Sequence, residues 1–402
     1  MNLRQFINYI FSRAKWQKVA FIARDQLATI YQLFRSIRAN DCSSLTDAAS
    51  LLSSTNFSES SYISTIEIPE NIAQLQSLDK KTQDTIVSNK VKTELLYVSA
   101  KILNASMYTD GARHQSVFDG HGRRVEEFSY GELPWFSNNV LVHRPAKRID
   151  GLSLNLCGTI AIAGGNYGHW LIDGYARLGM ALGECDLSEF THVVVPTLKY
   201  DFHYDSLLNV GIQAEKIIEL KPLDCIQFER LVCISSPRGS SSSIVPGWII
   251  DFYQNYASGV TGQQLSAERV YISRKDAPGR NIKNEESIIA MLEKYDFQII
   301  ELSQFRYDEK VSIFKNARIV VGLSGAGLVN LMFANPNLKV IEIMPRTSAS
   351  YLFASISAYL GIRHEVLIFD KTSTLKYLNP YYGSFEVDQA ELEELVVKAI
   401  YA

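Results

Sequence analysis

The clearest pattern along the chain is an alternation of short, β-branched apolar runs with longer segments whose apolar residues recur at helical spacing, beginning near Ser153. Its most regular part, residues 318–345, has an apolar run at 319–321, a turn with three glycines, a helical pattern at 328–333 and a second apolar run at 340–344. These runs predict a strand, a glycine turn, a helix and a strand. Strands that alternate with helices at this spacing are typical of a parallel, doubly wound α/β sheet.

The alternation falls into two blocks, and the run rich in Pro, Gly and Ser at 235–247 between them predicts an interdomain linker. The first block is predicted to contain strands at 154–163, 192–195, 216–220 and 230–234, a buried helix around 170–182 and a short helix at 204–209. The second is predicted to contain strands at 269–272, 298–302 and 365–369, helices at 284–295, 308–317 and 348–360, and a last helix that begins at Asp388. Two Rossmann-like blocks leave a cleft between the carboxyl ends of their sheets, where we expect the ligand.

The first ninety residues do not follow this alternation. Residues 1–38 carry seven basic side chains and one acidic one, Asp25, with apolar residues at helical spacing, which predicts basic amphipathic helices. Such helices either bind an anionic membrane surface or pack on the protein or a second subunit, and both alternatives stay open. The basic residues interrupt the apolar stretch, which argues against a signal peptide or a transmembrane span. Residues 40–90 are rich in Ser, Thr and Asn and are predicted to be irregular, with one short helix.

Composition narrows the class of protein. The chain has 402 residues, of which 47% are hydrophobic and 21% charged, with a formal net charge of −3. This is the balance of a soluble globular protein of two or three domains, without the excess of basic residues that nucleic acid binding requires. The five cysteines are scattered and form no CxxC pair, which favours free thiols in a reducing compartment over disulfides or a zinc site.

The glycine turn at Gly322, Gly325 and Gly327 is the first candidate site. Glycines let a ligand approach the backbone, and free amides at the start of a helix attract an anion, so the turn fits a phosphate. The alternative is that the glycines only allow a helix to pack closely on the sheet. The GxxGxG pattern with Glu342 downstream also fits the ribose-binding acid of an NAD-dependent oxidoreductase, but this turn lies late in its block, whereas the dinucleotide fingerprint normally opens the domain.

Three separated motifs carry a resemblance to a known family. In order, they are GNYGHWLIDGYARL, YISRKDAPGRNIKNEESI and IVVGLSGAGLVNLMFANPNLKVIEIMP, which together span Gly164 to Pro345. The chain thereby resembles a bacterial-type member of glycosyltransferase family 61. The resemblance implies an inverting enzyme of GT-B architecture that uses a nucleotide sugar, with two Rossmann-like domains facing a cleft. Ser324 is a departure, since many members carry a histidine there, and a role that requires imidazole at this position is in doubt.

With this resemblance, the chain divides into four parts. They are a helical and irregular region at 1–90, an acceptor-side Rossmann-like domain at 91–240, a nucleotide-sugar-binding Rossmann-like domain at 241–386, and a C-terminal helix at 387–402 that packs back on the molecule. A non-catalytic carbohydrate-binding protein is a further alternative. It predicts the loss of His169 or Asp173, and both residues are present.

The catalytic candidates are His169 and Asp173, which share one face of a helix because they are four residues apart. Inverting transfer needs a base for the acceptor hydroxyl, and imidazole accepts a proton near neutral pH. We therefore predict His169 as the base and Asp173 as the group that orients it, with the exchanged roles as the alternative. Acceptor contacts are assigned to Asn166 and Tyr167.

The donor site is predicted on the other side of the cleft. Arginine side chains fork onto phosphate oxygens, and the amides of the glycine turn assist them. Asn330 and Glu342 either hold the ribose or secure the local backbone, and Arg280 alternatively pairs with a nearby glutamate. The predicted donor-binding residues are Arg274, Arg280, Ser324, Gly325, Ala326, Gly327, Asn330 and Glu342.

No metal and no cofactor are predicted. The chain contains no Asp-x-Asp motif, the usual carboxylate pair that holds a divalent cation on a nucleotide diphosphate, and His114 and His121 lack metal-ligand spacing. The predicted partners are a nucleotide sugar, UDP-linked by preference, and a glycan or glycolipid acceptor. The predicted location is the cytoplasm, peripheral to the inner face of the cytoplasmic membrane, in the synthesis of a surface polysaccharide such as capsule or lipopolysaccharide. The sugar and the oligomeric state stay open.

Deletion of residues 1–38 tests the membrane alternative. If these basic helices dock on anionic lipid, the truncated protein should no longer cosediment with acidic vesicles, and raising the salt concentration should release the intact protein because salt screens the attraction. Vesicle binding that ignores salt, or a loss of oligomers without any change in lipid binding, would favour packing on the protein itself.

Overall fold

The structure is a computed structural model, and it describes most of the chain. The described residues are 45–46, 56–67, 85–87, 90–111, 114–131, 145–158, 165–184, 186–238, 244–258, 267–276, 281–345, 350–369 and 384–401. The helices predicted within 1–38 lie outside this part, as do Cys42, Cys185 and Arg280. The other three cysteines, Cys157, Cys225 and Cys233, are buried free thiols.

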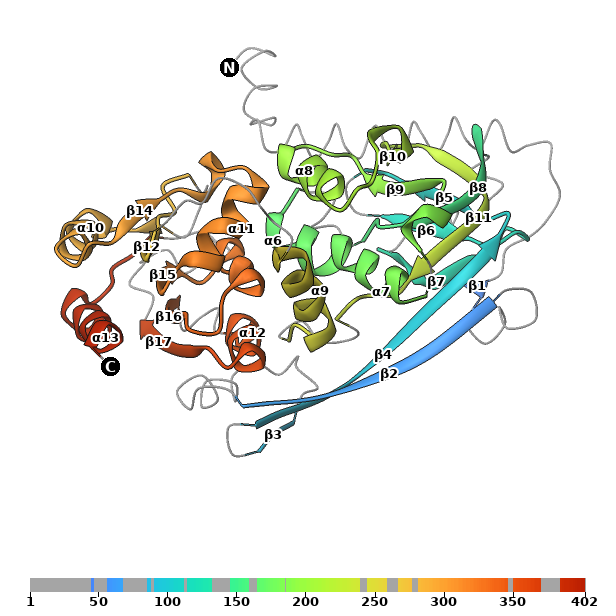
Figure 1. The fold of residues 1–402 in the computed structure, drawn as a ribbon. Coiled ribbons are helices and arrows are strands. Elements are labelled where there is room, and N and C mark those ends of the chain that lie inside the picture. Colours follow the sequence, from blue (N-terminus) through green and yellow to red (C-terminus); the bar gives the residue numbers. More distant parts are fainter. Residues whose placement is uncertain are drawn as a thin grey trace, which may run out of the picture.

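The N-terminal unit is built on a mixed sheet (Figure 1). Four neighbouring strands, in the order β10-β9-β8-β11, are parallel, and β4 and β5 pair antiparallel with β11. A purely parallel, doubly wound sheet at 91–240 is therefore wrong, because the short turns between β4 and β7 permit only antiparallel neighbours. The strands are β1 (Leu45–Thr46), β4 (Lys90–Leu103), β5 (Ser106–Thr109), β6 (Gln115–Phe118), β7 (Arg124–Tyr130), β8 (Lys147–Asn155), β9 (His192–Pro196), β10 (Ile217–Leu220) and β11 (Cys225–Ile234).

A long antiparallel ribbon corrects the expectation that residues 40–90 are irregular. β2 (Asn56–Glu67) pairs along its whole length with β4, and β3 (Thr85–Val87) pairs with the same strand. Figure 1 shows this ribbon extending below both units. The ladder partner supplies the backbone hydrogen bonds, so a polar segment without apolar alternation becomes a strand through a non-local contact.

The helices of the N-terminal unit follow the predicted order. The predicted strand at 154–163 ends at Asn155, and the predicted buried helix is formed by three consecutive segments, α6 (Tyr167–His169), the π-helix η3 (Trp170–Tyr175) and α7 (Ala176–Glu184). They are followed by η4 (Leu187–Glu189), α8 (Asp201–Asn209) and η5 (Ala214–Lys216). A π-helical turn inside an α-helix is rare and is often found at functional sites.

The C-terminal unit is a doubly wound parallel sheet, as predicted, with the strand order β14-β12-β15-β16-β17. Its strands are β12 (Arg269–Ile272), β14 (Gln298–Ile300), β15 (Ile319–Leu323), β16 (Lys339–Pro345) and β17 (Arg363–Phe369), and the short β13 (Asn281–Ile282) and β18 (Ser384–Phe385) pair separately. The order reverses between β12 and β15. Ligands bind at such a switch point, outside the carboxyl ends of the two strands.

Helices cover both faces of this sheet (Figure 1). α10 (Glu285–Glu293) and α13 (Gln389–Tyr401) pack on one face, where buried Leu392 and Val396 meet the strands. η6 (Leu302–Gln304), α11 (Tyr307–Asn316), η7 (Ala326–Phe333) and α12 (Leu352–Leu360) contribute to the other face, where η7 is a 3-10 helix in place of the predicted α-helix.

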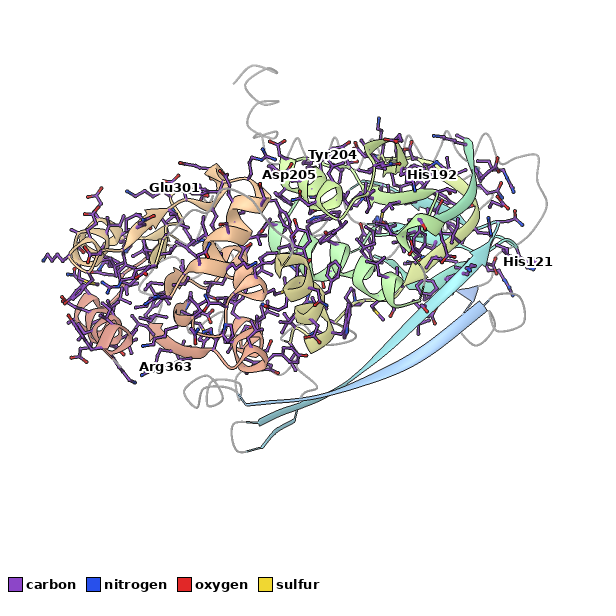
Figure 2. All side chains as sticks on the ribbon, viewed as in Figure 1. His121, His192, Tyr204, Asp205, Glu301 and Arg363 are labelled. Carbon is purple, nitrogen blue, oxygen red and sulfur yellow. The ribbon has the colours of Figure 1, made fainter. Side chains whose placement is uncertain are left out.

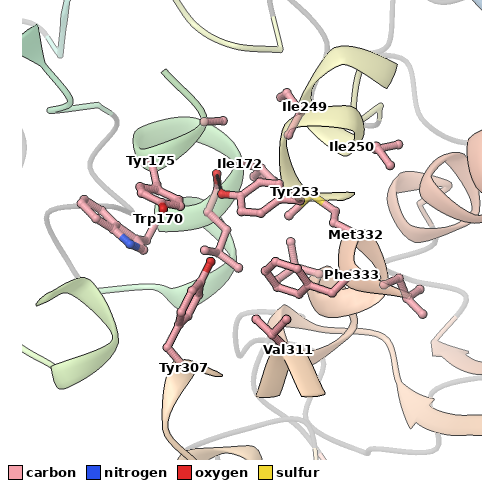
Figure 3. Packing of buried hydrophobic residues seen from close by; sticks show 14 of the residues in the cluster. Trp170, Ile172, Tyr175, Ile249, Ile250, Tyr253, Tyr307, Val311, Met332 and Phe333 are labelled. Atoms are coloured by element: carbon pink, nitrogen blue, oxygen red, sulfur yellow. Dashed lines mark hydrogen bonds between the residues drawn. The ribbon is translucent and has the colours of Figure 1, made fainter. Parts of the chain in front are cut away.

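One hydrophobic core joins the two units on this second face. A helix that the sequence pattern did not predict, α9 (Gly247–Ser258), lies between them and buries Ile249, Ile250 and Tyr253. Figure 3 shows Tyr253 between Tyr175 of the π-helix and Phe333 of η7, and its ring centroid lies 6.0 Å from that of Tyr175 and 5.2 Å from that of Phe333. The Tyr253 hydroxyl donates to the Leu171 carbonyl at 2.7 Å. The run predicted as a linker, 235–247, thus leads into a helix that begins at its last residue and packs between the two units.

Candidate active site

His169 and Asp173 are in contact where η3 begins. The His169 Nδ1 atom lies 2.5 Å from Asp173 Oδ2. The side chain of Asp173 is 2% exposed, whereas that of His169 is 37% exposed. One partner is therefore enclosed in the protein, and the other presents part of its imidazole to solvent.

A buried arginine holds the carboxylate from its other side. Arg238 donates from Nε to Asp173 Oδ1 at 2.8 Å and from Nη2 to Oδ2 at 2.9 Å, which is a bidentate pair. Burial by itself would raise the pKa of Asp173, but the charge of Arg238 and the hydrogen bonds from His169 and Arg238 together outweigh it and lower the pKa to about 2. At neutral pH this carboxylate is an anion with very little tendency to accept a proton.

A second arginine ties the same helix to the sheet. Arg177 on α7 is buried and donates from Nε to the carbonyl of Ile234, and from Nη1 to the carbonyl of Cys157. Ile234 ends β11, and Cys157 follows the end of β8 by two residues. The helix that carries Asp173 is thus anchored at the carboxyl edge of the parallel strands.

The start of this helix touches the C-terminal unit. A Cβ atom added to Gly168 would lie 3.5 Å from the Cα atom of Ala326, so the backbone beside His169 lies close against the glycine turn. Two predicted site residues fasten this junction. The Tyr167 hydroxyl donates to Asn330 Oδ1 at 2.5 Å, and Asn330 Nδ2 donates to the Gly327 carbonyl at 2.9 Å.

The predicted acceptor contact Asn166 is exposed and caps the helix, since its Oδ1 accepts from the His169 amide at 3.2 Å. The buried Asn330 has both ends of its side-chain amide engaged within the protein, which agrees with the alternative that it secures the local backbone. Their roles in binding a substrate stay predictions.

The glycine turn and Arg274 lie at the carboxyl ends of the two switch-point strands. Arg274 follows β12, and Ser324 follows β15, where its amide donates to the Ile343 carbonyl at 2.8 Å. Gly325 is the cap residue of η7, and Ala326 and Gly327 open this helix and are partly exposed. The first amides of a helix have no partner within it, so they are available to an anion.

Glu342 lies inside the sheet. It is fully buried in the middle of β16, and its Oε2 lies 3.0 Å from His364 Nε2, while His364 Nδ1 lies 2.8 Å from the Ser357 hydroxyl. Its Oε1 atom has no hydrogen-bond partner among the described residues. The apolar strand context therefore did require a partner for Glu342, and the partner is a histidine that the sequence analysis did not single out.

The sequence analysis also missed Arg238 and Lys310. Arg238 lies within the run that was predicted to be a linker, and no spacing relates it to Asp173, which is 65 residues away. Lys310 occupies an ordinary helical position in the sequence, yet it is buried. In the described part of the chain, no group of three or more His, Cys, Asp or Glu side chains is placed to hold a metal ion. None of the described helices is long and apolar enough to cross a membrane.

A histidine–carboxylate pair beside a glycine turn, at the carboxyl ends of parallel strands in two sheets, is typical of a ligand-binding site in an α/β enzyme. Residues 167–341 match the sequence model of the family described as Glycosyltransferase 61, which confirms the resemblance predicted from the three motifs. The chain is also similar to the EGF domain-specific O-linked N-acetylglucosamine transferase of Drosophila melanogaster, with 29% identity over 97 residues. This segment is 23% of the chain and 18% of the fly protein, so the similarity spans less than a fifth of that relative.

Replacement of Arg238 by Met tests the buried ion pair. Because the pKa of Asp173 is lowered in the folded protein, its pairing adds stability above the ordinary pKa near 3.8, and this stability is lost as pH falls toward about 2. Arg238→Met removes the arginine from the buried carboxylate and leaves it only the contact with His169, so the free energy of unfolding should fall by about 3–5 kcal/mol at pH 7. Urea unfolding at several pH values should show this difference shrinking toward pH 3, because protonation of Asp173 removes the uncompensated charge in the variant.

Arg306→Met is the matched control, because the side chain of Arg306 is 72% exposed. It should change the free energy of unfolding by less than about 0.5 kcal/mol. A difference between wild type and Arg238→Met that stays constant from pH 7 to pH 3 would contradict the ion-pair explanation.

Proposed function

We propose that this protein is an inverting glycosyltransferase that moves a hexosyl or pentosyl group from a nucleotide sugar to a glycan or glycolipid, with His169 as the general base. The observation that carries the proposal is the hydrogen-bonded chain of His169, Asp173 and Arg238, here called the relay. Its imidazole is partly exposed, and the adjacent backbone touches the glycine turn of the other unit. This proximity supports acceptor activation and donor binding at one site.

The relay gives each residue a distinct task. Asp173 contacts Nδ1 of His169, so Nε2 is the nitrogen that accepts the proton of the acceptor hydroxyl. The acceptor oxygen then attacks the anomeric carbon from the face opposite the nucleotide, and the nucleoside diphosphate departs with the electron pair of the broken bond. The low pKa of Asp173 argues against the exchanged roles, because such a weak base cannot take a hydroxyl proton effectively.

For the donor, we propose the switch point of the C-terminal unit. Ala326 and Gly327 follow the carboxyl end of β15, and Arg274 follows that of β12. Hydrogen-bond donors at these strand ends would stabilise the charge on a departing diphosphate. We further propose that the two units form a GT-B architecture and that Arg280 also binds the donor. We propose that transfer needs no metal ion, because the chain contains no Asp-x-Asp motif.

The dinucleotide alternative has less support. The GxxGxG turn follows β15, the third strand along the chain of the five-stranded sheet, whereas the fingerprint belongs after the first. The carboxylate of Glu342, which would have to bind the ribose, is buried within the sheet and contacts His364. We also propose that the protein is cytoplasmic, lies at the inner face of the cytoplasmic membrane as a peripheral protein, and builds a surface polysaccharide.

Binding of nucleotides tests the donor class. In a calorimetric or thermal-shift panel of UDP, GDP, CDP, ADP, TDP, their sugars and NAD, we expect a nucleoside diphosphate or its sugar to bind and NAD to fail, with the affinity unchanged by EDTA. Tight NAD binding would instead support the oxidoreductase. Sugar transfer abolished by EDTA and restored by Mn²⁺ would contradict the metal-independent mechanism.

His169→Ala should lower turnover by about a hundredfold or more and leave nucleotide affinity nearly unchanged, as expected for the loss of a general base. His121→Ala is the control, since His121 lies in a loop of the N-terminal unit far from this junction (Figure 2) and should keep full turnover. The readout is sugar transfer with the donor from the panel. Near-normal turnover in His169→Ala with a folded but inactive Asp173→Asn would give the base role to Asp173, and weakened nucleotide binding would place His169 in the donor site.

A further inference from the structure

Lys310 is a buried cation without an anionic partner in the described part of the chain. It is 6% exposed, and no carboxylate or hydrogen-bond acceptor among the described residues binds its ammonium. The ammonium instead lies 5.0 Å from the ring centroid of Tyr167 and 5.9 Å from that of Phe202. Cation–π contacts compensate only part of the cost of removing an ammonium from water.

Lys310 lies near the carboxyl edge of the C-terminal sheet because it is close to the start of α11. α11 runs from the carboxyl edge of the sheet, where Tyr307 begins it, to the amino edge, where β15 starts at Ile319. Lys310 is the fourth residue of α11 and therefore lies at the carboxyl edge, the side at which parallel sheets bind ligands. Lys315 is more than one turn further on, toward the opposite edge.

The contacts of Lys310 lead to the candidate active site. Tyr167, whose ring faces the ammonium, is two residues before His169, and its hydroxyl reaches Asn330, which holds the Gly327 carbonyl. The ammonium therefore lies beside the Tyr167–Asn330 hydrogen bond, which joins the helix that carries His169 to the glycine turn. The other ring belongs to Phe202 on α8, the helix of the N-terminal unit that packs against α11.

Three carboxylates act on this amine from a greater distance. Burial lowers the pKa of Lys310 below its ordinary value, and the carboxylates of Asp205, Glu309 and Asp276 offset only part of this effect. Figure 2 shows Asp205 on α8 at the side that faces the second unit, and Asp276 follows β12 at the switch point. In the described part of the chain, none of the three carboxylates forms an ion pair with the ammonium.

We propose that the Lys310 ammonium binds a phosphate oxygen of the nucleotide donor and stabilises the negative charge of the departing diphosphate. This inference rests on the proposed function and adds a binding residue from α11 to it. An ammonium acts on a diphosphate as a compact charge with three donors, which complements the planar fork of an arginine such as Arg274.

The test compares each nucleoside diphosphate with its own nucleoside, for example UDP with uridine, by calorimetry on the full chain. Lys310→Met keeps the apolar stem and removes the charge, so it should weaken UDP binding about tenfold or more and leave uridine binding unchanged. Lys310→Gln, which keeps a polar end, should behave in the same way. Lys315→Met on the same helix is the matched control and should bind both ligands like the wild type.

The outcomes separate this inference from the proposed function. Wild-type affinity for UDP in the folded Lys310→Met and Lys310→Gln variants would overturn the inference while the donor class stands, because the cation would then only join the two units. An equal loss of UDP and uridine affinity would overturn it as well, since the lysine would then shape the nucleoside site. A wild-type protein that binds none of the five nucleoside diphosphates would overturn the proposed donor and this inference together.

Discussion

The shared hydrophobic core between the two sheets is the constraint on which the candidate site depends. Neither the helix that carries His169 nor the glycine turn forms the candidate site alone, because each lies at the edge of its own sheet. Tyr175, Tyr253 and Phe333 come from three elements and pack together, which fixes the two edges against each other. Closely packed interiors resist small displacements, so this contact defines the distance between His169 and Ala326 without any bond between them.

Within that frame, the buried charge of Asp173 determines the chemistry. An isolated carboxylate in this position would take up a proton, but Arg238 and His169 together stabilise its anion. The anion in turn holds Nδ1 of the imidazole. The proposed function assigns the acceptor proton to the other nitrogen, Nε2. The arginine thus acts on the histidine through the carboxylate, although it lies on the chain segment between the two units.

The sequence was sufficient for the local elements of the C-terminal unit. Apolar periodicity located β12, α11, β16 and α13 to within a few residues, since each is a short segment whose burial pattern repeats at its own period. The last helix was predicted to begin at Asp388, and the Oδ1 atom of this residue accepts from the amides of Ala390 and Glu391. The sequence pattern did not predict β2, which has little apolar alternation and forms because it pairs with β4. It also did not predict α9, which directly follows a serine-rich run.

By itself, the sequence determined the doubly wound order of the second unit, the pairing of His169 with Asp173 on one helix face, and the glycine turn, because all three depend on residues close together along the chain. The tertiary structure decided which charges meet. Arg238, Lys310 and His364 have unremarkable spacing, and they acquire their surroundings only when segments far apart in the chain pack together. Burial and the identity of a buried group's neighbour are properties of that packing, and they set whether a carboxylate is an anion, a lysine is unpaired, or a linker residue belongs to the site.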